Sequence, residues 1–173
     1  MNLFRVDTRF FKVGELIQPK NCFEKILKDE RAEIEDWLNK LHPSEMPERG
    51  KCLFLFQDLS CALHHVAKYG GYIYCVSPGF VYFRGDMNKL DNILYVFKIT
   101  KDDGIREAVI KEYWNAFSST YNPCYEILAN QAVVESFICG EDIKSRITEE
   151  LKSKGGCIER CPIYLDLLKK IYT

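Results

Sequence analysis

The sequence lacks the features that mark membrane proteins, secreted proteins and proteins that bind a nucleic-acid backbone broadly. No apolar run approaches the about 18 residues that indicate a membrane-spanning helix. Arg5 and Arg9 interrupt any apolar core of a signal peptide near the start of the chain. The formal net charge is −1 and no long block of like charge occurs, which argues against extended electrostatic contact with nucleic acid. We therefore expect a cytoplasmic protein without a membrane segment.

The cysteines do not have the spacing of a metal site. The chain contains eight of them, but only Cys157 and Cys161 lie close together, and no histidine is near that pair. We predict no metal ion and reduced thiols throughout, with zinc binding at this pair as the alternative. Four cysteines fall in apolar runs, where a thiol behaves as a small core side chain: Cys52, Cys61, Cys75 and Cys139.

Motifs of the common enzyme classes are also absent. Neither a glycine-rich phosphate loop nor a Gly-x-Ser-x-Gly nucleophile turn occurs. The three histidines, His42, His64 and His65, stand at no spacing that marks a Cys–His nucleophile pair. The absence of these motifs means that none of them identifies an activity for this chain.

What the sequence does contain is the composition of a folded domain. Of its 173 residues, 47% are apolar and 13% are aromatic, which is enough for a well-buried core. No internal repeat or low-complexity linker divides the chain. We therefore predict one domain over residues 1–173.

Hydrophobic periodicity predicts a mixture of helices and strands. Helical spacing covers residues 21–41, 58–69, 102–117, 141–152 and 162–172. Strand patterns cover residues 2–6, 51–56, 72–78, 92–100 and 125–138. The first helix has a possible capping box, Asn21 with Glu24. Residues 125–138 are either two strands that separate near Ala129 and Asn130 or one long bent strand. Strands that follow one another late in the chain favour an α+β fold over a doubly wound parallel sheet.

Three segments follow one another along the chain: "LFRVDTRFFKVGELIQP", "CLFLFQDLSCALHHVAKYGGYIYCVSP" and "YEILANQAVVESFI". In this order they resemble the ADP-ribosyltransferase superfamily. The turn "KVGELIQP" closely matches the one that follows the first strand in rifamycin-type ADP-ribosyltransferases. "PERGKCLFLF" and "EYWNAF" followed by "YEIL" also resemble a poorly characterised bacterial and phage group. The resemblance implies a split mixed β-sheet core with flanking helices.

The resemblance also implies a substrate and roles for individual residues. The substrate is NAD, Glu126 is the catalytic carboxylate, and Arg5 binds the ribose hydroxyls or a phosphate. The backbone of Val6 pairs with the nicotinamide amide, and Phe54 stacks on the nicotinamide ring. The remaining NAD contacts are expected at Asp7, Thr8, Arg49, Ser60 and Tyr113.

The residue types suit that chemistry. Breaking the bond between nicotinamide and ribose develops positive charge on the sugar, which a carboxylate near the 2′-hydroxyl stabilises. An arginine fork donates several hydrogen bonds to a phosphate or to hydroxyls. An aromatic ring is attracted to the cationic nicotinamide. The acceptor of ADP-ribose is expected to be a macromolecule, and the resemblance suggests a toxin or a phage-conflict effector.

Two departures from the family pattern keep other interpretations open. Phe54 stands where the family usually has a tyrosine, and Cys124 replaces the upstream acidic residue of the arginine-modifying branch. One alternative is a catalytically inactive, ADP-ribosyltransferase-like binding module. Another is an unrelated α+β interaction domain, in which Arg5 is an exposed charge at a strand end. Glu126 would then lie on the strand surface, facing away from its two neighbours.

Overall fold

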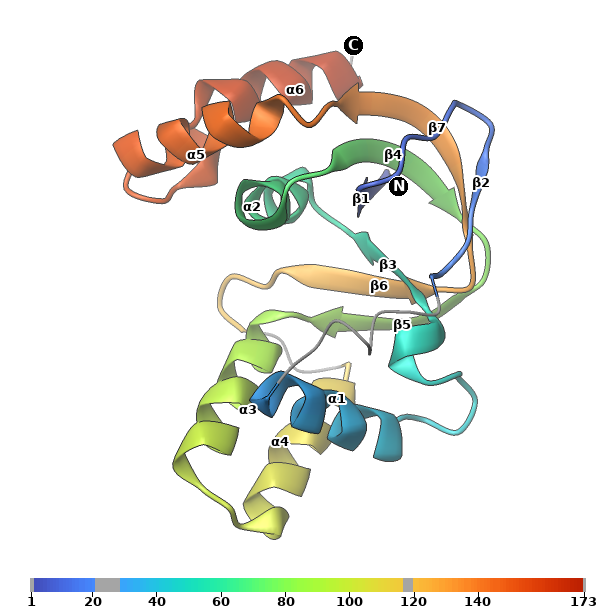
Figure 1. Ribbon diagram of the computed structural model, residues 1–173, viewed down its shortest axis with the longest axis vertical. Helices are drawn as coiled ribbons and strands as arrows, with labels where there is room; N and C mark the ends of the chain where they lie inside the picture. Colours follow the sequence, from blue (N-terminus) through green and yellow to red (C-terminus); the bar gives the residue numbers. More distant parts are fainter. Residues whose placement is uncertain (1, 21–28, 117–119, 173) are drawn as a thin grey trace. The chain divides into compact units, whose positions relative to one another are not determined.

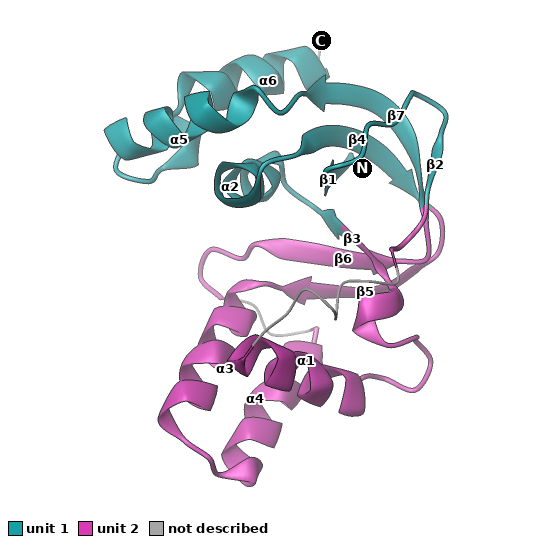
Figure 2. Cartoon of the chain, viewed as in Figure 1, with its two compact units in different colours: residues 1–17, 55–78, 132–173 teal, residues 18–54, 79–131 magenta. Residues whose placement is uncertain are grey.

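The computed structural model describes residues 2–20, 29–116 and 120–172, which form two compact units (Figure 2). Unit 1 contains residues 1–17, 55–78 and 132–173, and unit 2 contains residues 18–54 and 79–131. The chain therefore changes unit at four places, and strand β3 (Leu53–Phe56) contains one of them. The capping box predicted at Asn21 and Glu24 lies outside the described residues.

The strands of unit 1 form an antiparallel sheet in the order β2-β7-β4-β1, and the end of β3 pairs with β1 (Figure 1). The register places Arg5 of β1 opposite Tyr74 of β4, and Phe4 opposite both Cys75 and Phe56. The strands are β1 (Leu3–Asp7), β2 (Leu16–Ile17), β4 (Tyr72–Pro78) and β7 (Ala132–Cys139).

Helix α2 links this sheet to the other helices of unit 1. It packs against β1 and β4, and α5 and α6 pack against it (Figure 1). Its buried side chains include Leu59, Leu63 and Val66, which share one helical face, and it ends at Gly70 with a φ of 79°. The helices are α2 (Leu59–Tyr69), α5 (Ile143–Ser153), α6 (Pro162–Tyr172) and the short 3₁₀ turn η3 (Ile158–Arg160).

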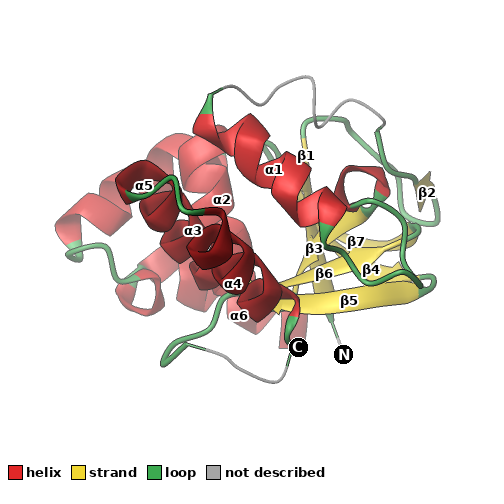
Figure 3. Cartoon of the chain, turned by 90° about the horizontal axis from the view of Figure 1, so that it is seen from below, coloured by secondary structure: helices red, strands yellow, loops and turns green. Residues whose placement is uncertain are grey.

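In its described residues, unit 2 combines a small set of strands with several helices, and Figure 3 distinguishes the helices and strands of the chain by colour. The strand order is β3-β6-β5, with β5 and β6 antiparallel. Helices α3 and α4 pack on one another, α1 contacts both, and α4 contacts β5. The elements are α1 (Glu30–Lys40), η2 (Arg49–Lys51), β5 (Val81–Asp86), α3 (Asn88–Ile99), α4 (Asp103–Trp114) and β6 (Tyr125–Ala129).

The core of unit 2 lies between these helices and β5. Its buried side chains come from α1, α3, α4 and both strands of the β5–β6 pair, and Trp37 packs edge-on against Phe97. Burial of this apolar surface is the main contribution to folding of the unit. The fully buried members are Ile93, Phe97, Ile110, Tyr113 and Leu128.

One secondary-structure expectation is wrong: residues 92–99 belong to helix α3 instead of a strand. A strand that was not expected, β5, lies just before this helix. The aromatic and β-branched residues favour a strand locally, but Ile93 and Phe97 are four residues apart and share one buried helical face. Packing in the core of unit 2 therefore overrides local preference.

The α+β class is confirmed, and residues 125–138 form two strands, β6 and β7, instead of one. The expectation of a mixed sheet is not met, because all the pairings with a defined register are antiparallel. In the described ranges, no helix is both long enough and apolar enough to cross a bilayer. These same ranges contain no cluster of three or more side chains suited to hold a metal ion.

The expectation that all cysteines are reduced thiols is wrong for Cys61 and Cys124, which are disulfide-bonded. The apolar context of a cysteine does not show whether the fold brings another thiol to it, so the sequence pattern missed this. Burial raises the pKa of the Cys52 thiol to about 11 and that of Cys139 to about 12. Among the residues that the structure describes, the free thiols are Cys52, Cys75, Cys139, Cys157 and Cys161.

Candidate functional site

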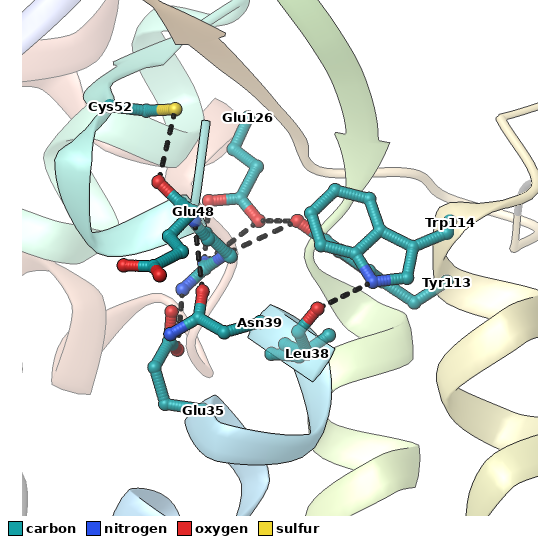
Figure 4. Close-up of polar contacts among 9 residues, drawn as sticks. Glu35, Leu38, Asn39, Glu48, Cys52, Tyr113, Trp114 and Glu126 are labelled. Carbon is teal, nitrogen blue, oxygen red and sulfur yellow. Dashed lines mark hydrogen bonds and ion pairs between the residues drawn. The ribbon is translucent and has the colours of Figure 1, made fainter. Parts of the chain in front are cut away.

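A cluster of charged and aromatic side chains in unit 2 is the candidate site (Figure 4). Glu126 is the second residue of β6, and Arg49 is the first residue of η2. Tyr113 comes from the last turn of α4, and Glu35 comes from the middle of α1. Four elements that are well separated in sequence therefore each contribute one side chain.

Arg49 is the centre of this cluster. Its Nη2 donates to both carboxylate oxygens of Glu126, at 3.0 and 2.9 Å, and its Nη1 donates to Glu35 at 2.8 Å. Its Nε donates to the hydroxyl of Tyr113 at 3.3 Å. One guanidinium thus bridges two carboxylates and a phenol, using the fixed fork geometry of arginine.

Tyr113 provides a second hydrogen bond to Glu126. Its hydroxyl donates to Oε1 of Glu126 at 2.5 Å, a short distance of the kind found for bonds to a charged acceptor. Burial and the nearby Glu126 carboxylate raise the pKa of Tyr113 well above its usual value. The phenol therefore keeps its proton and remains a donor to Glu126.

The cluster is nearly closed to solvent. The exposed fraction is 5% for Arg49, 5% for Glu35, 2% for Glu126 and zero for Tyr113. Burial is the largest influence on Arg49 and opposes its charge. The negative charges of Glu126 and Glu35, together with the hydrogen bond to Tyr113, outweigh burial, so the pKa of Arg49 lies well above its usual value. Arg49 is therefore a permanent cation whose removal would leave two buried carboxylates uncompensated.

Aromatic and backbone contacts fix the position of Arg49. The guanidinium carbon lies 4.6 Å from the ring centroid of Phe54, a favourable cation–π distance. The backbone N–H of Arg49 donates to the side-chain oxygen of Asn39 at 2.9 Å, which ties η2 to α1. Trp114 Nε1 donates to the carbonyl of Leu38 at 3.1 Å and ties α4 to the same helix. Both ties are drawn in Figure 4.

A different arginine cluster lies in unit 1, at the end of β1. Asp7 accepts from Arg5 Nη2 at 2.7 Å and from Arg9 Nη2 at 2.9 Å, and it also accepts from the backbone N–H of Arg9. Burial acts to raise the pKa of Asp7, but the two arginines outweigh it and hold the pKa well below its usual range. Burial lowers the pKa of Arg5. Two cations therefore share one carboxylate here.

The structure groups the predicted site residues in two sets. Arg49, Phe54, Tyr113 and Glu126 lie together in the cluster of unit 2, within reach of Arg49. The other predicted residues belong to unit 1. There Val6 is buried and pairs with Ile73, Thr8 is exposed, and Ser60 is the half-buried second residue of α2. The remaining two of this set, Arg5 and Asp7, form the ion pair described above.

Sequence reasoning missed Glu35 and Arg9, and it misjudged the surroundings of Glu126. Glu35 stands in a charged stretch that is typical of a solvated helix face, yet it is 5% exposed. Arg9 lies two residues after Asp7, but strand periodicity does not show that a turn brings their side chains together. Glu126 is buried where an outward-facing or cleft-facing carboxylate was expected, because Arg49 and Tyr113 compensate its charge.

A separate hollow in unit 1 contains none of the predicted residues. It has a volume of about 370 Å³ and lies between β7, α5 and α6. Its lining mixes apolar side chains with Asp142, Arg146 and Asp166. The candidate site therefore does not coincide with this hollow.

No protein-family model matches the chain, and no curated protein sequence is significantly similar to it. The interpretation of the cluster in unit 2 therefore rests on its geometry and on the resemblance of the sequence segments that contribute to it.

Proposed function

We propose that this protein is an NAD-dependent ADP-ribosyltransferase with an ADP-ribosyltransferase-like fold, which transfers ADP-ribose from NAD to a macromolecular acceptor. The supporting observation is that Arg49, Phe54 and Tyr113 lie in one cluster with Glu126: Arg49 and Tyr113 donate to its carboxylate, and Phe54 lies against the guanidinium of Arg49. The resemblance assigns a role in NAD binding to the first three and catalysis to Glu126. Tyr113 and Glu126 lie more than 50 residues after Arg49 in the sequence, so tertiary packing brings them to it.

In this proposal Glu126 stabilises the positive charge that develops on ribose as nicotinamide departs with the bonding electrons. The acceptor nucleophile then forms the new bond to the same ribose carbon and loses its proton to water. Arg49 is the proposed contact of the NAD pyrophosphate. Phe54 is the proposed stacking partner of the nicotinamide ring.

The test is release of nicotinamide from NAD by the purified protein, with a cell lysate as the source of acceptor. We expect Glu126→Gln to lower turnover at least about 100-fold, the scale on which enzymes lose a group that stabilises transition-state charge. The matched control is Glu107→Gln on α4, because Glu107 lies outside the cluster and pairs with Lys111. Equal turnover in both variants, or no turnover by the wild type, contradicts the proposal.

A second candidate function is an inactive, ADP-ribosyltransferase-like binding module. The observation that favours it is the full engagement of Glu126, whose two oxygens already accept from Arg49 and Tyr113 in a buried setting. A module of this kind binds NAD or a partner without chemistry. A rise in melting temperature with NAD, without nicotinamide release, supports this function over the first.

A cytoplasmic setting, as a toxin or phage-conflict effector, remains part of the proposal. The disulfide-bonded Cys61 and Cys124 weigh against it, since disulfides persist mainly in oxidising compartments. Labelling of free thiols in protein taken directly from its native cells separates the two settings. Reactive Cys61 and Cys124 support a cytoplasmic protein, and protected ones contradict it.

A further inference from the structure

The segment Gly85-Asp86, at the end of β5, lies directly beside the candidate catalytic residue. The antiparallel register of β5 and β6 places Gly85 opposite Glu126 and Asp86 opposite Tyr125. Neither Gly85 nor Asp86 belongs to a segment that resembles the ADP-ribosyltransferases. Their contacts nevertheless act on Glu126 from two directions, one through a side chain and one through the backbone.

Gly85 leaves the space that the ring of Tyr113 needs. A Cβ at this position would lie 2.5 Å from Cε1 of Phe83 and 3.1 Å from Cε2 of Tyr113. Both distances are shorter than ordinary van der Waals contact, so any larger residue would displace one ring or the other. Glycine is therefore needed at position 85 because a side chain would not fit beside these rings.

The ring of Tyr113 is held in the place that Gly85 leaves open. Its centroid lies 5.4 Å from that of Phe83 and 4.8 Å from that of Trp114, in tilted and edge-on arrangements. The hydroxyl at the end of this ring is the group that donates to Oε1 of Glu126. A Cβ at Gly85 would press first on the Phe83 ring, which packs against the ring of Tyr113, and would also come close to Tyr113 itself.

Asp86 fixes the backbone that leads into β6. Its carboxylate accepts from the backbone N–H of Thr120 at 2.7 Å and from the hydroxyl of Thr120 at 2.6 Å. It also accepts from the backbone N–H groups of Asn88 at 3.1 Å and Cys124 at 3.2 Å. Cys124 directly precedes β6, so these bonds hold the backbone at the start of the strand that contains Glu126.

We infer that Gly85 and Asp86 are positioning residues for the Glu126 carboxylate, Gly85 by admitting the Tyr113 ring and Asp86 by fixing the entry to β6. Their effect on catalysis rests on the proposed function. Their effect on the position of Glu126 follows from contacts within unit 2 and is tested separately.

The first test is kinetic and compares Tyr113→Phe and Gly85→Ala with matched controls elsewhere. We expect kcat for NAD cleavage to fall about 10- to 100-fold in both variants, as for loss of a hydrogen bond to a charged group. KM is expected to change less than kcat, because the bond that is lost is the one that Tyr113 donates to Glu126. The controls, Gly104→Ala in α4 and Tyr164→Phe in α6, keep both constants.

The second test does not depend on NAD. Protein labelled with ¹³C at the glutamate carboxyl carbon gives an NMR resonance for Glu126 that is identified by its loss in Glu126→Gln. We expect this resonance to shift in Tyr113→Phe, Gly85→Ala and Asp86→Asn, and to stay in place in the two controls.

The two tests separate the inference from the proposed function. An unchanged Glu126 resonance in folded Tyr113→Phe and Gly85→Ala overturns the positioning role, whatever the kinetics. A shifted resonance in a wild type that does not cleave NAD supports the positioning role and contradicts the transferase. Should Gly85→Ala fail to fold, Asp86→Asn decides the positioning role by the same measurement, and an unchanged Glu126 resonance in folded Asp86→Asn overturns that role.

Discussion

The two arginine clusters of this protein have opposite compositions. In unit 2, Arg49 lies between the carboxylates of Glu126 and Glu35, whereas in unit 1 the carboxylate of Asp7 lies between Arg5 and Arg9. The first cluster has an excess of negative charge and is buried, and the second has an excess of positive charge.

Exposure also differs between them. The side chains of Arg5 and Arg9 are 19% and 31% exposed, against 6% for Arg49. A buried cluster with an extra carboxylate suits stabilisation of a developing cation, whereas an accessible one with an extra guanidinium suits an anionic group.

The largest expected effect comes from breaking the buried cluster. Replacing Arg49 by Met leaves Glu35 and Glu126 without their shared cation, and we expect a loss of about 3–5 kcal/mol in the free energy of unfolding. Urea unfolding measures this loss. The matched control is Arg146→Met on α5, where the arginine is 56% exposed and its pairing with Glu150 contributes little. Similar losses in both variants would show that Arg49 has no special role.

An intermediate effect is expected from acidifying the cluster of unit 1. Because the pKa of Asp7 is lower in the folded protein than in the unfolded chain, Asp7 stabilises the fold fully above its ordinary pKa. That contribution is lost as the pH falls from about 4 through the folded pKa, and its size is on the order of 1–2 kcal/mol. Unfolding measured across this range should show a weaker acid dependence in Asp7→Asn than in the wild type. Equal slopes would contradict the ion pair.

The smallest expected effect on stability comes from replacing the aromatic rings that contact the arginines of the two clusters. Arg49 lies over Phe54 and Arg9 lies over Phe11, with distances of 4.6 and 4.9 Å to the ring centroids. Both rings are half-buried, but only Arg49 is removed from water, where a cation–π contact is stronger. We expect Phe54→Leu to destabilise more than Phe11→Leu, by about 1 kcal/mol. Thermal unfolding measures the stability of both variants. An equal loss in the two, or a larger loss in Phe11→Leu, would contradict this expectation.

Local pattern was sufficient for elements whose periodicity agrees with their packing. The helix at α2 with its terminal glycine, and the strands β4, β6 and β7, follow from sequence alone because each has one clear period or a clear breaker. The error at residues 92–100 arose where β-branched and aromatic residues lie on a helix. Strand β5 was missed because its residues, "VYFRGD", do not form a regular apolar alternation.

Local sequence pattern predicts the contacts of the candidate site even less well than it predicts the helices and strands. Each of Arg49, Phe54, Tyr113 and Glu126 was selected by its place in a segment, but their bonds to one another depend on tertiary packing. Glu35 had no local signal at all, since a buried glutamate in a charged helix has the same spacing as an exposed one. The space at Gly85 depends on the rings of two other elements, and no pattern around Gly85 contains that information.

The path of the chain through the two units has a consequence for synthesis on the ribosome. All of unit 2 lies within residues 18–131, whereas unit 1 still lacks β7, α5 and α6 when that stretch is complete. At about 5–20 residues per second, the last segment follows some seconds later, so a nascent chain contains every residue of the Arg49 cluster well before β4 has its partner β7. Until then, the strands β1 and β4 are a sheet with an open edge, the kind of surface that chaperones cover.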